Sequence, residues 1–277
     1  MPSTYAHYYF GKKMIALYPY HIRSLVQEYR NLYDIGLHGP DILFYYRPLK
    51  RNSVNSVGFS MHEKPGSEFF SSAASKWQLY AYDDAQRDRH TAYLLGFLCH
   101  YALDRSCHGY VEKKIHVCGI SHTEIETEFD RYLLSLEGND PLRTNLAQHI
   151  QASNENARII SDFFPTISDE QILQALQSMI RCHHLLQAPY ALKRWFLLGV
   201  LRITGNHRDM SGMVMKKHPN PECNQSNLAL KNRLEQALTQ CQSLTQDYLY
   251  CLEHQIPVDS SFNPTFGADD QWQNICL

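Results

Sequence analysis

Residues 95–108 read Leu-Gly-Phe-Leu-Cys-His-Tyr-Ala-Leu-Asp-Arg-Ser-Cys-His. Its apolar side chains recur at spacings of three and four, which is typical of a buried α-helix. His100, Asp104 and His108 also lie four residues apart, so they form a second stripe on the same helix. An aspartate in such a helix is costly to bury unless it is paired or binds a cation. The stretch therefore predicts a helix that carries metal ligands into the interior.

Helical periodicity continues through most of the remaining chain, and alternating strand patterns are nearly absent, so we predict an all-α, multi-helix fold. Ser168-Asp-Glu-Gln is typical of a helix start, and Ser121 and Thr123 lie close to another. Gly109 and Gly138 lie near expected helix ends. The predicted helices cover residues 3–18, 20–31, 67–80, 85–107, 119–136, 140–152, 168–187, 189–203 and 226–254.

Two stretches rich in glycine and proline interrupt this pattern. Residues 34–66 are predicted to form a long ordered loop or a set of broken turns, and loops of that length usually carry function. For residues 204–225 two interpretations stay open, a lid or pocket rim and a solvated connection between helices.

The chain has 277 residues, of which 44% are hydrophobic, so it can bury a substantial core. We expect one domain over residues 1–277, with the metal-site half at about 1–135 and a helical second half at about 136–277. The net charge of -2 gives no overall electrostatic case for nucleic acid, and no stable nucleic-acid partner is expected.

The amino terminus lacks the pattern of a secretory signal, and no apolar run approaches a membrane span, so we expect a cytoplasmic protein. The eight cysteines form no Cys-x-x-Cys pair. In a reducing compartment they are expected to be buried or partly buried thiols.

Imidazole and carboxylate side chains without thiolate are typical of a hydrolytic zinc site with an open coordination position. His122-Thr-Glu-Ile-Glu126 repeats the spacing of four, although an exposed helix face is the simpler interpretation of that segment. Asp41 follows a proline and could be only a turn residue. His38 could be a hydrogen-bond partner of ligands instead of a ligand. The candidate metal ligands are His7, Asp41, His62, His100, Asp104, His108, His122 and Glu126.

The order of these residues resembles the zinc-dependent phospholipase C family, which is related to the three-zinc single-strand nucleases. The resemblance covers residues 1–130 and includes the segments Tyr33-Asp-Ile-Gly-Leu-His-Gly-Pro-Asp41-Ile-Leu-Phe44 and Gly96-Phe-Leu-Cys-His-Tyr-Ala-Leu-Asp104. The second half of the chain matches only as generic helices.

The resemblance implies the fold of that family and two or three Zn²⁺ ions. One ion would be held by Asp41, His62, His100 and Asp104, and a second by His108, His122 and Glu126. Asp104 would also bridge to a third ion, which is completed by His7 and by the amine of the amino-terminal residue. That residue is Pro2 if Met1 is removed.

The implied activity is hydrolysis of a phosphodiester by metal-activated water, with Asp41 as a metal ligand that orients or deprotonates the nucleophile. The expected substrate is a phospholipid or another phosphoester. A single-strand nuclease and a hydrolase of small phosphoesters are alternatives. A zinc-binding protein with little turnover is another, because the chain lacks the family's amino-terminal tryptophan and has two fewer residues before the third histidine.

Overall fold

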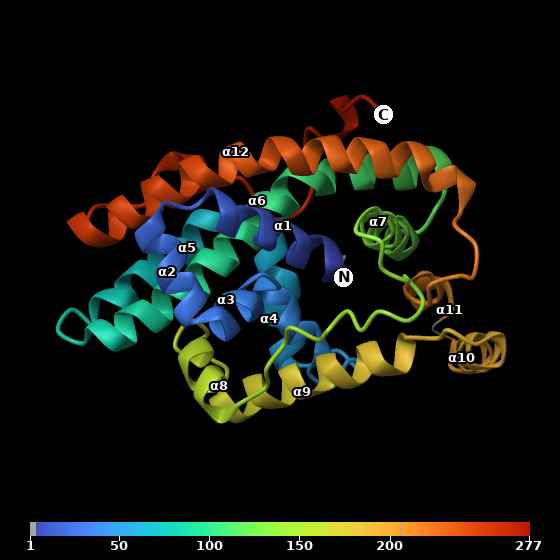
Figure 1. The fold of residues 1–277 in the computed structure, drawn as a ribbon, viewed down its shortest axis with the longest axis horizontal. Coiled ribbons are helices and arrows are strands. Elements are labelled where there is room, and N and C mark those ends of the chain that lie inside the picture. The colour runs from blue at the N-terminus through green and yellow to red at the C-terminus, as the bar shows by residue number, and fades with distance from the viewer. Residues whose placement is uncertain (1–3, 206) are drawn as a thin grey trace.

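The computed structural model describes residues 4–205 and 207–277, and no strand occurs among them, which confirms the all-α prediction (Figure 1). The α-helices are α1 (Thr4–Leu17), α2 (Tyr20–Glu28), α3 (Arg30–Gly36), α4 (Ser53–His62), α5 (Gly66–Gln78), α6 (Asp84–Cys118), α7 (His122–Leu136), α8 (Asn154–Ser161), α9 (Asp169–Leu186), α10 (Ala191–Ile203), α11 (His207–Met210) and α12 (Asn224–His254). The 3₁₀ helices are η1 (Gly39–Tyr45), η2 (Ser211–Met213), η3 (Pro221–Cys223), η4 (Ser260–Phe262) and η5 (Trp272–Asn274).

Helix α6 is the central element, and it is long because apolar side chains surround most of its length. The Asp83 side chain caps its start by accepting a hydrogen bond from the backbone N–H of Gln86, and Gly119, with a φ of 68°, ends it. The expected end at Gly109 is wrong. That glycine lies inside the helix, where a Cβ would come within 2.5 Å of the Ile275 side chain.

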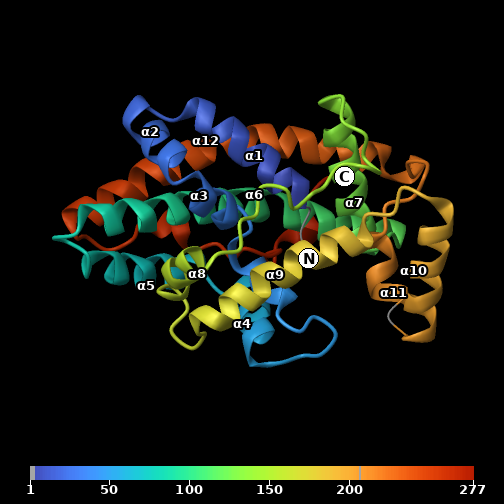
Figure 2. The same cartoon turned by 60° about the horizontal axis from the view of Figure 1, so that its bottom comes forward.

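Helices α12 and α6 run side by side along the molecule. Helix α9 lies on another side of the molecule, where it packs on both η1 and α8 (Figures 1 and 2). Helix α3 crosses α6 where two glycines meet. A Cβ on Gly96 would lie 2.1 Å from the carbonyl oxygen of Tyr33, and one on Gly36 would lie 2.3 Å from that of Tyr93. The close crossing holds the segment after α3 against the middle of α6.

The predicted helix over 140–152 is wrong, since these residues form turns. The Asp140 side chain accepts a hydrogen bond from the N–H of Leu142, and the Asn145 side chain accepts one from Ala147. Such local bonds compete with the helical pattern. The helix starts only after Ser153, whose side chain caps α8.

The predicted long loop over 34–66 is also partly wrong, because it contains η1 and α4. Asn52 and Asn55 form a capping box at the start of α4, so His62 is the last residue of a helix and not a loop residue. The helix start predicted at Ser168 is confirmed by a capping box with Gln171, and Ser121 caps α7. Gly138, with a φ of 73°, follows the end of α7 as expected.

All eight cysteines are free thiols, although two of them, Cys118 and Cys276, are exposed. Within the described residues, every helix is too short or too polar to span a lipid bilayer.

Candidate metal centre

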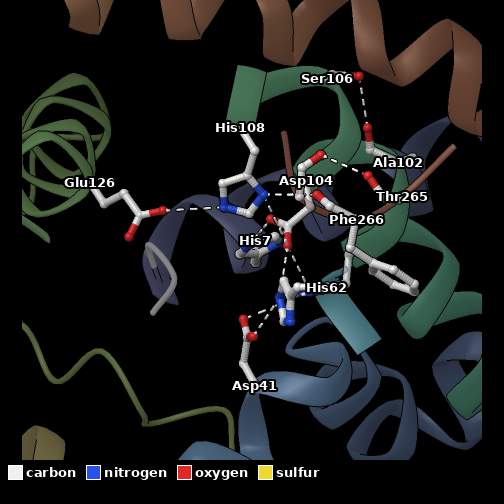
Figure 3. A network of polar contacts seen from close by, with 12 residues as sticks. His7, Asp41, His62, Ala102, Asp104, Ser106, His108, Glu126, Thr265 and Phe266 are labelled. Atoms are coloured by element: carbon white, nitrogen blue, oxygen red, sulfur yellow. Dashed lines mark hydrogen bonds and ion pairs between the residues drawn. The ribbon is translucent and has the colours of Figure 1, made fainter. Parts of the chain in front are cut away.

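All eight candidate ligands lie around one region between four helices and η1. His7 comes from α1, Asp41 from η1 and His62 from the end of α4. Helix α6 supplies His100, Asp104 and His108, and α7 supplies His122 and Glu126. Figure 3 shows six of these side chains turned toward one another, with Asp104 in the middle.

Asp104 is the shared residue of the first cluster, and its two carboxylate oxygens face different partners. Oδ1 lies 3.1 Å from His7 Nε2, whereas Oδ2 lies 3.0 Å from His100 Nε2 and 3.5 Å from His62 Nε2. The rings of His7 and His100 stack with centroids 4.4 Å apart. A carboxylate with partners on both oxygens can bridge two cations.

Asp41 completes the first cluster from the side of η1. Its Oδ1 lies 3.1 Å from His62 Nε2, and its Oδ2 lies 3.7 Å from His100 Nε2. One ligand atom from each of His7, Asp41, His100 and Asp104 falls within 4.8 Å of the others. These four residues are buried, and His62 flanks them at their more open side.

The second cluster consists of His108, His122 and Glu126. Glu126 Oε1 lies 2.9 Å from His122 Nε2 and 3.8 Å from His108 Nε2, and the three ligand atoms fall within 4.8 Å of one another. His108 also joins the two clusters, because its Nδ1 lies 3.6 Å from Asp104 Oδ2.

Backbone carbonyls fix the tautomer of three of the histidines. A carbonyl oxygen only accepts hydrogen bonds, so the Nδ1 that faces it carries the proton and the neutral ring's Nε2 keeps a free lone pair. This arrangement is typical of histidines that bind metal through Nε2. The three contacts are His62 Nδ1 to Gly58 O at 2.8 Å, His100 Nδ1 to Leu37 O at 3.3 Å and His108 Nδ1 to Phe266 O at 2.9 Å.

Several of these atoms are buried without a hydrogen bond of good geometry in the described part of the chain. They include both carboxylate oxygens of Asp41, Asp104 Oδ2, His100 Nε2 and Glu126 Oε2. Buried polar atoms are rarely left without a partner. Imidazole nitrogens and carboxylate oxygens that converge in this way can coordinate a cation, and zinc binds this set of donors.

The electrostatics of the two clusters agree with this fit. Burial acts to lower the pKa of His62, but Asp41 and Asp104 outweigh it and raise that pKa to about 10. Burial likewise opposes Asp104 and Glu126, which raise the pKa of His108 to about 9. Burial acts to raise the pKa of Asp104, but His100 and His108 hold it well below its usual range. The site therefore attracts positive charge strongly in the absence of metal.

Both clusters open onto one pocket. Phe44 and Phe59 stack at its wall with centroids 4.4 Å apart, and the Arg51 guanidinium lies 4.9 Å from the Phe59 ring. The pocket is lined by Asp41, Phe44, Phe59, His62, His108, Glu112, His122, Gly267 and Ala268.

Asp130 is a buried carboxylate beside the site that is not among the residues predicted from the sequence. Its carboxylate accepts hydrogen bonds from the backbone N–H groups of Tyr5 and Ala6, at 3.1 and 2.7 Å, and so positions the start of α1 and His7. The view of α7 as an exposed face is wrong, since Glu126, Glu128, Asp130 and Arg131 are buried. The spacing of four between Glu126 and Asp130 is the signal that could have identified Asp130.

A second group missed from the sequence lies beside the first cluster. His38 Nε2 is 2.7 Å from His149 Nε2, and the ring of His149 stacks on Tyr8 at 4.0 Å. His183 Nε2 lies 3.1 Å from both the Tyr45 and the Thr4 hydroxyl oxygens. The sequence suggests His38 as a hydrogen-bond partner of ligands, whereas its partner in the structure is another histidine, from a distant segment.

Comparison with family models matches residues 6–182 to the zinc-dependent phospholipase C family. The chain belongs to this family, whose members are zinc-dependent phosphodiester hydrolases. The match extends beyond residue 130 and so includes part of the half that sequence reasoning treated as generic helices. Among curated proteins and solved structures no match was found.

Pro2, the expected amino-terminal ligand of a third ion, lies outside the described residues. The assignment of the whole chain to one domain likewise stays a prediction.

Proposed function

We propose that this protein hydrolyses phosphodiesters with two or three zinc ions held by the eight residues, and that phospholipids are its substrates. The observation that carries the proposal is the convergence of buried carboxylate and imidazole atoms without hydrogen bonds of good geometry at the floor of one open pocket. Family membership supports the same reaction class.

Asp41, His62, His100 and Asp104 would hold one ion, and His108, His122 and Glu126 a second. Asp104 would reach a third ion through Oδ1, which faces His7, and Pro2 would complete that site. Bound zinc would supply Lewis acidity toward phosphoryl oxygens and make water nucleophilic near neutral pH.

Asp41 is proposed as the catalytic carboxylate. It belongs to the buried cluster and also lines the pocket, so its oxygens can accept a hydrogen bond from the attacking water and hold it in line with phosphorus. The backbone carbonyls behind His62, His100 and His108 keep the ring nitrogens in place during the reaction.

The stacked pair of Phe44 and Phe59 gives the pocket an apolar wall that suits the non-polar part of a phospholipid. The same pair, with Arg51 beside it, also favours a second candidate. Aromatic rings next to a cation can stack nucleobases, so a single-stranded nucleic acid is the alternative substrate.

Turnover of a chromogenic phosphodiester by the purified protein tests the proposal. We expect activity with zinc, loss of activity with chelator and recovery after zinc is restored. Asp104→Asn should lower kcat/KM by at least about 100-fold, because it removes the charge of a carboxylate whose two oxygens face different parts of the metal centre. Circular dichroism checks that the variant folds, and its zinc content should fall.

Asp162→Asn is the matched control. Asp162 is also a partly buried carboxylate beside a histidine, with Oδ2 2.8 Å from His90 Nε2, but it lies outside both clusters. Its substitution should leave zinc content and turnover unchanged. Activity that survives both chelator and Asp104→Asn would refute the mechanism.

A panel of phospholipids, nucleotides and single-stranded DNA separates the substrate classes. Fastest turnover of a phospholipid supports the proposal, and fastest turnover of DNA supports the alternative. Stoichiometric zinc without turnover on any of these substrates would indicate a zinc-binding protein with little catalytic activity.

A further inference from the structure

Helix α10 (Ala191–Ile203) carries an unusual exposed apolar stripe, and it lies outside the segment matched to the family. Trp195 is 74% exposed and Ile203 is 88% exposed. The spacing of the stripe is that of one helix face, since its members recur at three, four, seven, eight and eleven residues from the first. The stripe consists of Leu192, Trp195, Phe196, Gly199, Val200 and Ile203.

The opposite face of α10 anchors the helix, so the exposed stripe is not needed for folding. Leu197 is buried there and packs in a small cluster with Ala188 and Val214. Lys193 Nζ donates to the carbonyl of Gln187, and Arg194 Nη1 donates to that of Ala188, which ties the start of α10 to the segment after α9.

The segment that contains α10 has a net charge of opposite sign to that of the whole chain. Residues 171–205 contain no aspartate or glutamate, whereas the full chain has a net charge of -2. Arg202, in the last turn of α10, is exposed next to the apolar stripe. The basic residues of this segment are Arg181, Lys193, Arg194 and Arg202.

We propose that α10 is an interfacial docking helix that binds the surface of an anionic phospholipid bilayer. A tryptophan and a phenylalanine on one exposed face can enter the boundary between headgroups and acyl chains. The exposed Arg202 beside the stripe attracts anionic headgroups, and its aliphatic part tolerates the interface. Residues 171–205 contribute no acidic side chain that would repel such a surface.

The position of α10 relates this surface to the metal centre. The chain continues from α10 through α11 to η2, and η2 packs on the start of α7, where a Cβ on Gly212 would lie 2.6 Å from the backbone nitrogen of Glu124. Helix α7 carries His122 and Glu126. Figures 1 and 2 show α10, α11 and α7 at the same end of the molecule, so docking would bring that end toward the lipid.

Sedimentation of the full chain with phospholipid vesicles tests the proposal. The vesicles contain phosphatidylcholine alone or phosphatidylcholine with phosphatidylglycerol, and chelator is present so that binding is measured without hydrolysis. We expect binding to the anionic vesicles, weakened by added salt. The double variant Trp195→Ser/Phe196→Ser should lower the partition coefficient by at least about tenfold, because two large apolar side chains leave the interface.

The matched control is Leu79→Ser/Tyr82→Ser. These residues are 73% and 104% exposed, and the segment between α5 and α6 that contains them lies at the opposite end of the molecule (Figure 1). Vesicle binding that is unchanged in this control supports the proposal. Wild-type protein that stays in the supernatant, or equal loss of binding in both double variants, would overturn it.

Sedimentation velocity without lipid tests whether a second copy of the chain, instead of lipid, binds the apolar stripe. A wild-type dimer that becomes monomeric in the Trp195→Ser/Phe196→Ser variant would assign the stripe to self-association and overturn the lipid proposal. Because the vesicle assay requires no turnover, its outcome is independent of the hydrolase proposal.

Discussion

At the residue scale, the candidate site depends on which atom of each histidine faces a carboxylate. His62, His100 and His108 each donate a hydrogen bond from Nδ1 to a backbone carbonyl, which leaves Nε2 for the cluster. The main chain thus holds the three imidazole rings in place, and it moves less than a side chain would. Asp104 then receives partners on both oxygens.

The histidine pair beside the site predicts an acid sensitivity. Burial, with His183 nearby, lowers the pKa of His149 from 6.5 to about 3. Because the folded pKa is depressed, His149 contributes stability that is fully present above pH 6.5 and is lost as the pH falls toward 3. We expect the loss of unfolding free energy between pH 7 and pH 5 to be smaller by about 2 kcal/mol in His149→Gln than in wild type.

Chemical denaturation of metal-free protein at the two pH values measures this difference. The exposed His254 gives a control variant, His254→Gln, which should keep the wild-type pH dependence. An unchanged pH dependence in His149→Gln would show that the histidine is protonated equally in the folded and unfolded chains.

At the scale of elements, the crossing of α3 and α6 places η1 over the ligands of α6. Gly36 and Gly96 allow the backbones to touch, and the chain that leaves α3 reaches Asp41 within a few residues. Gly39, with a φ of 46°, makes the intervening turn directly against the His100 ring. The geometry of the first cluster is therefore set by helix packing.

Gly96→Ala should destabilise the fold and weaken zinc binding together. The new Cβ would lie 2.1 Å from the carbonyl oxygen of Tyr33, which is backbone and cannot rotate away. We expect a loss of about 1–3 kcal/mol of unfolding free energy, measured by denaturant titration with zinc binding followed in parallel.

Gly199→Ala on α10 is the matched helical control, because its Cβ would meet nothing within 4 Å. That variant should be more stable than wild type by about 0.5–1 kcal/mol, through helix propensity alone. Equal effects of the two substitutions would mean that the α3–α6 crossing is looser than the structure shows.

At the scale of the whole molecule, the metal centre joins segments that are far apart in the sequence. Helices α1, α4, α6 and α7 and the 3₁₀ helix η1 all contribute charged or imidazole groups to one buried region. Without a cation, the carboxylates and imidazoles there remain incompletely paired. Metal binding should therefore be coupled to the stability of the fold.

Zinc is expected to raise the thermal midpoint of the chelator-treated protein, with a stabilisation of about 3 kcal/mol when free zinc is a hundred times the dissociation constant. Differential scanning calorimetry with a zinc titration measures the shift. It should be much smaller in Asp104→Asn and unchanged in Asp162→Asn. No shift in the wild type would contradict the ligand assignment.

The amino-acid sequence by itself determined the all-α class, the ends of several helices and the candidate ligands, because helical spacing and capping residues act over a few neighbouring positions. His100, Asp104 and His108 could be identified together since one helix period relates them. The same local logic failed at 140–152, where short side chains hydrogen-bond to nearby backbone N–H groups and prevent a helix.

Only the tertiary structure decided how the ligands pair. Helical spacing relates His100 to Asp104, but the contact between Asp104 Oδ1 and His7 depends on how α1 packs on α6, and no spacing encodes it. Burial of Asp130 under α1 and exposure of Trp195 on α10 are likewise properties of distant contacts. The sequence alone does not show whether a given apolar or acidic side chain faces the core or the solvent. The packing of the helices determines this.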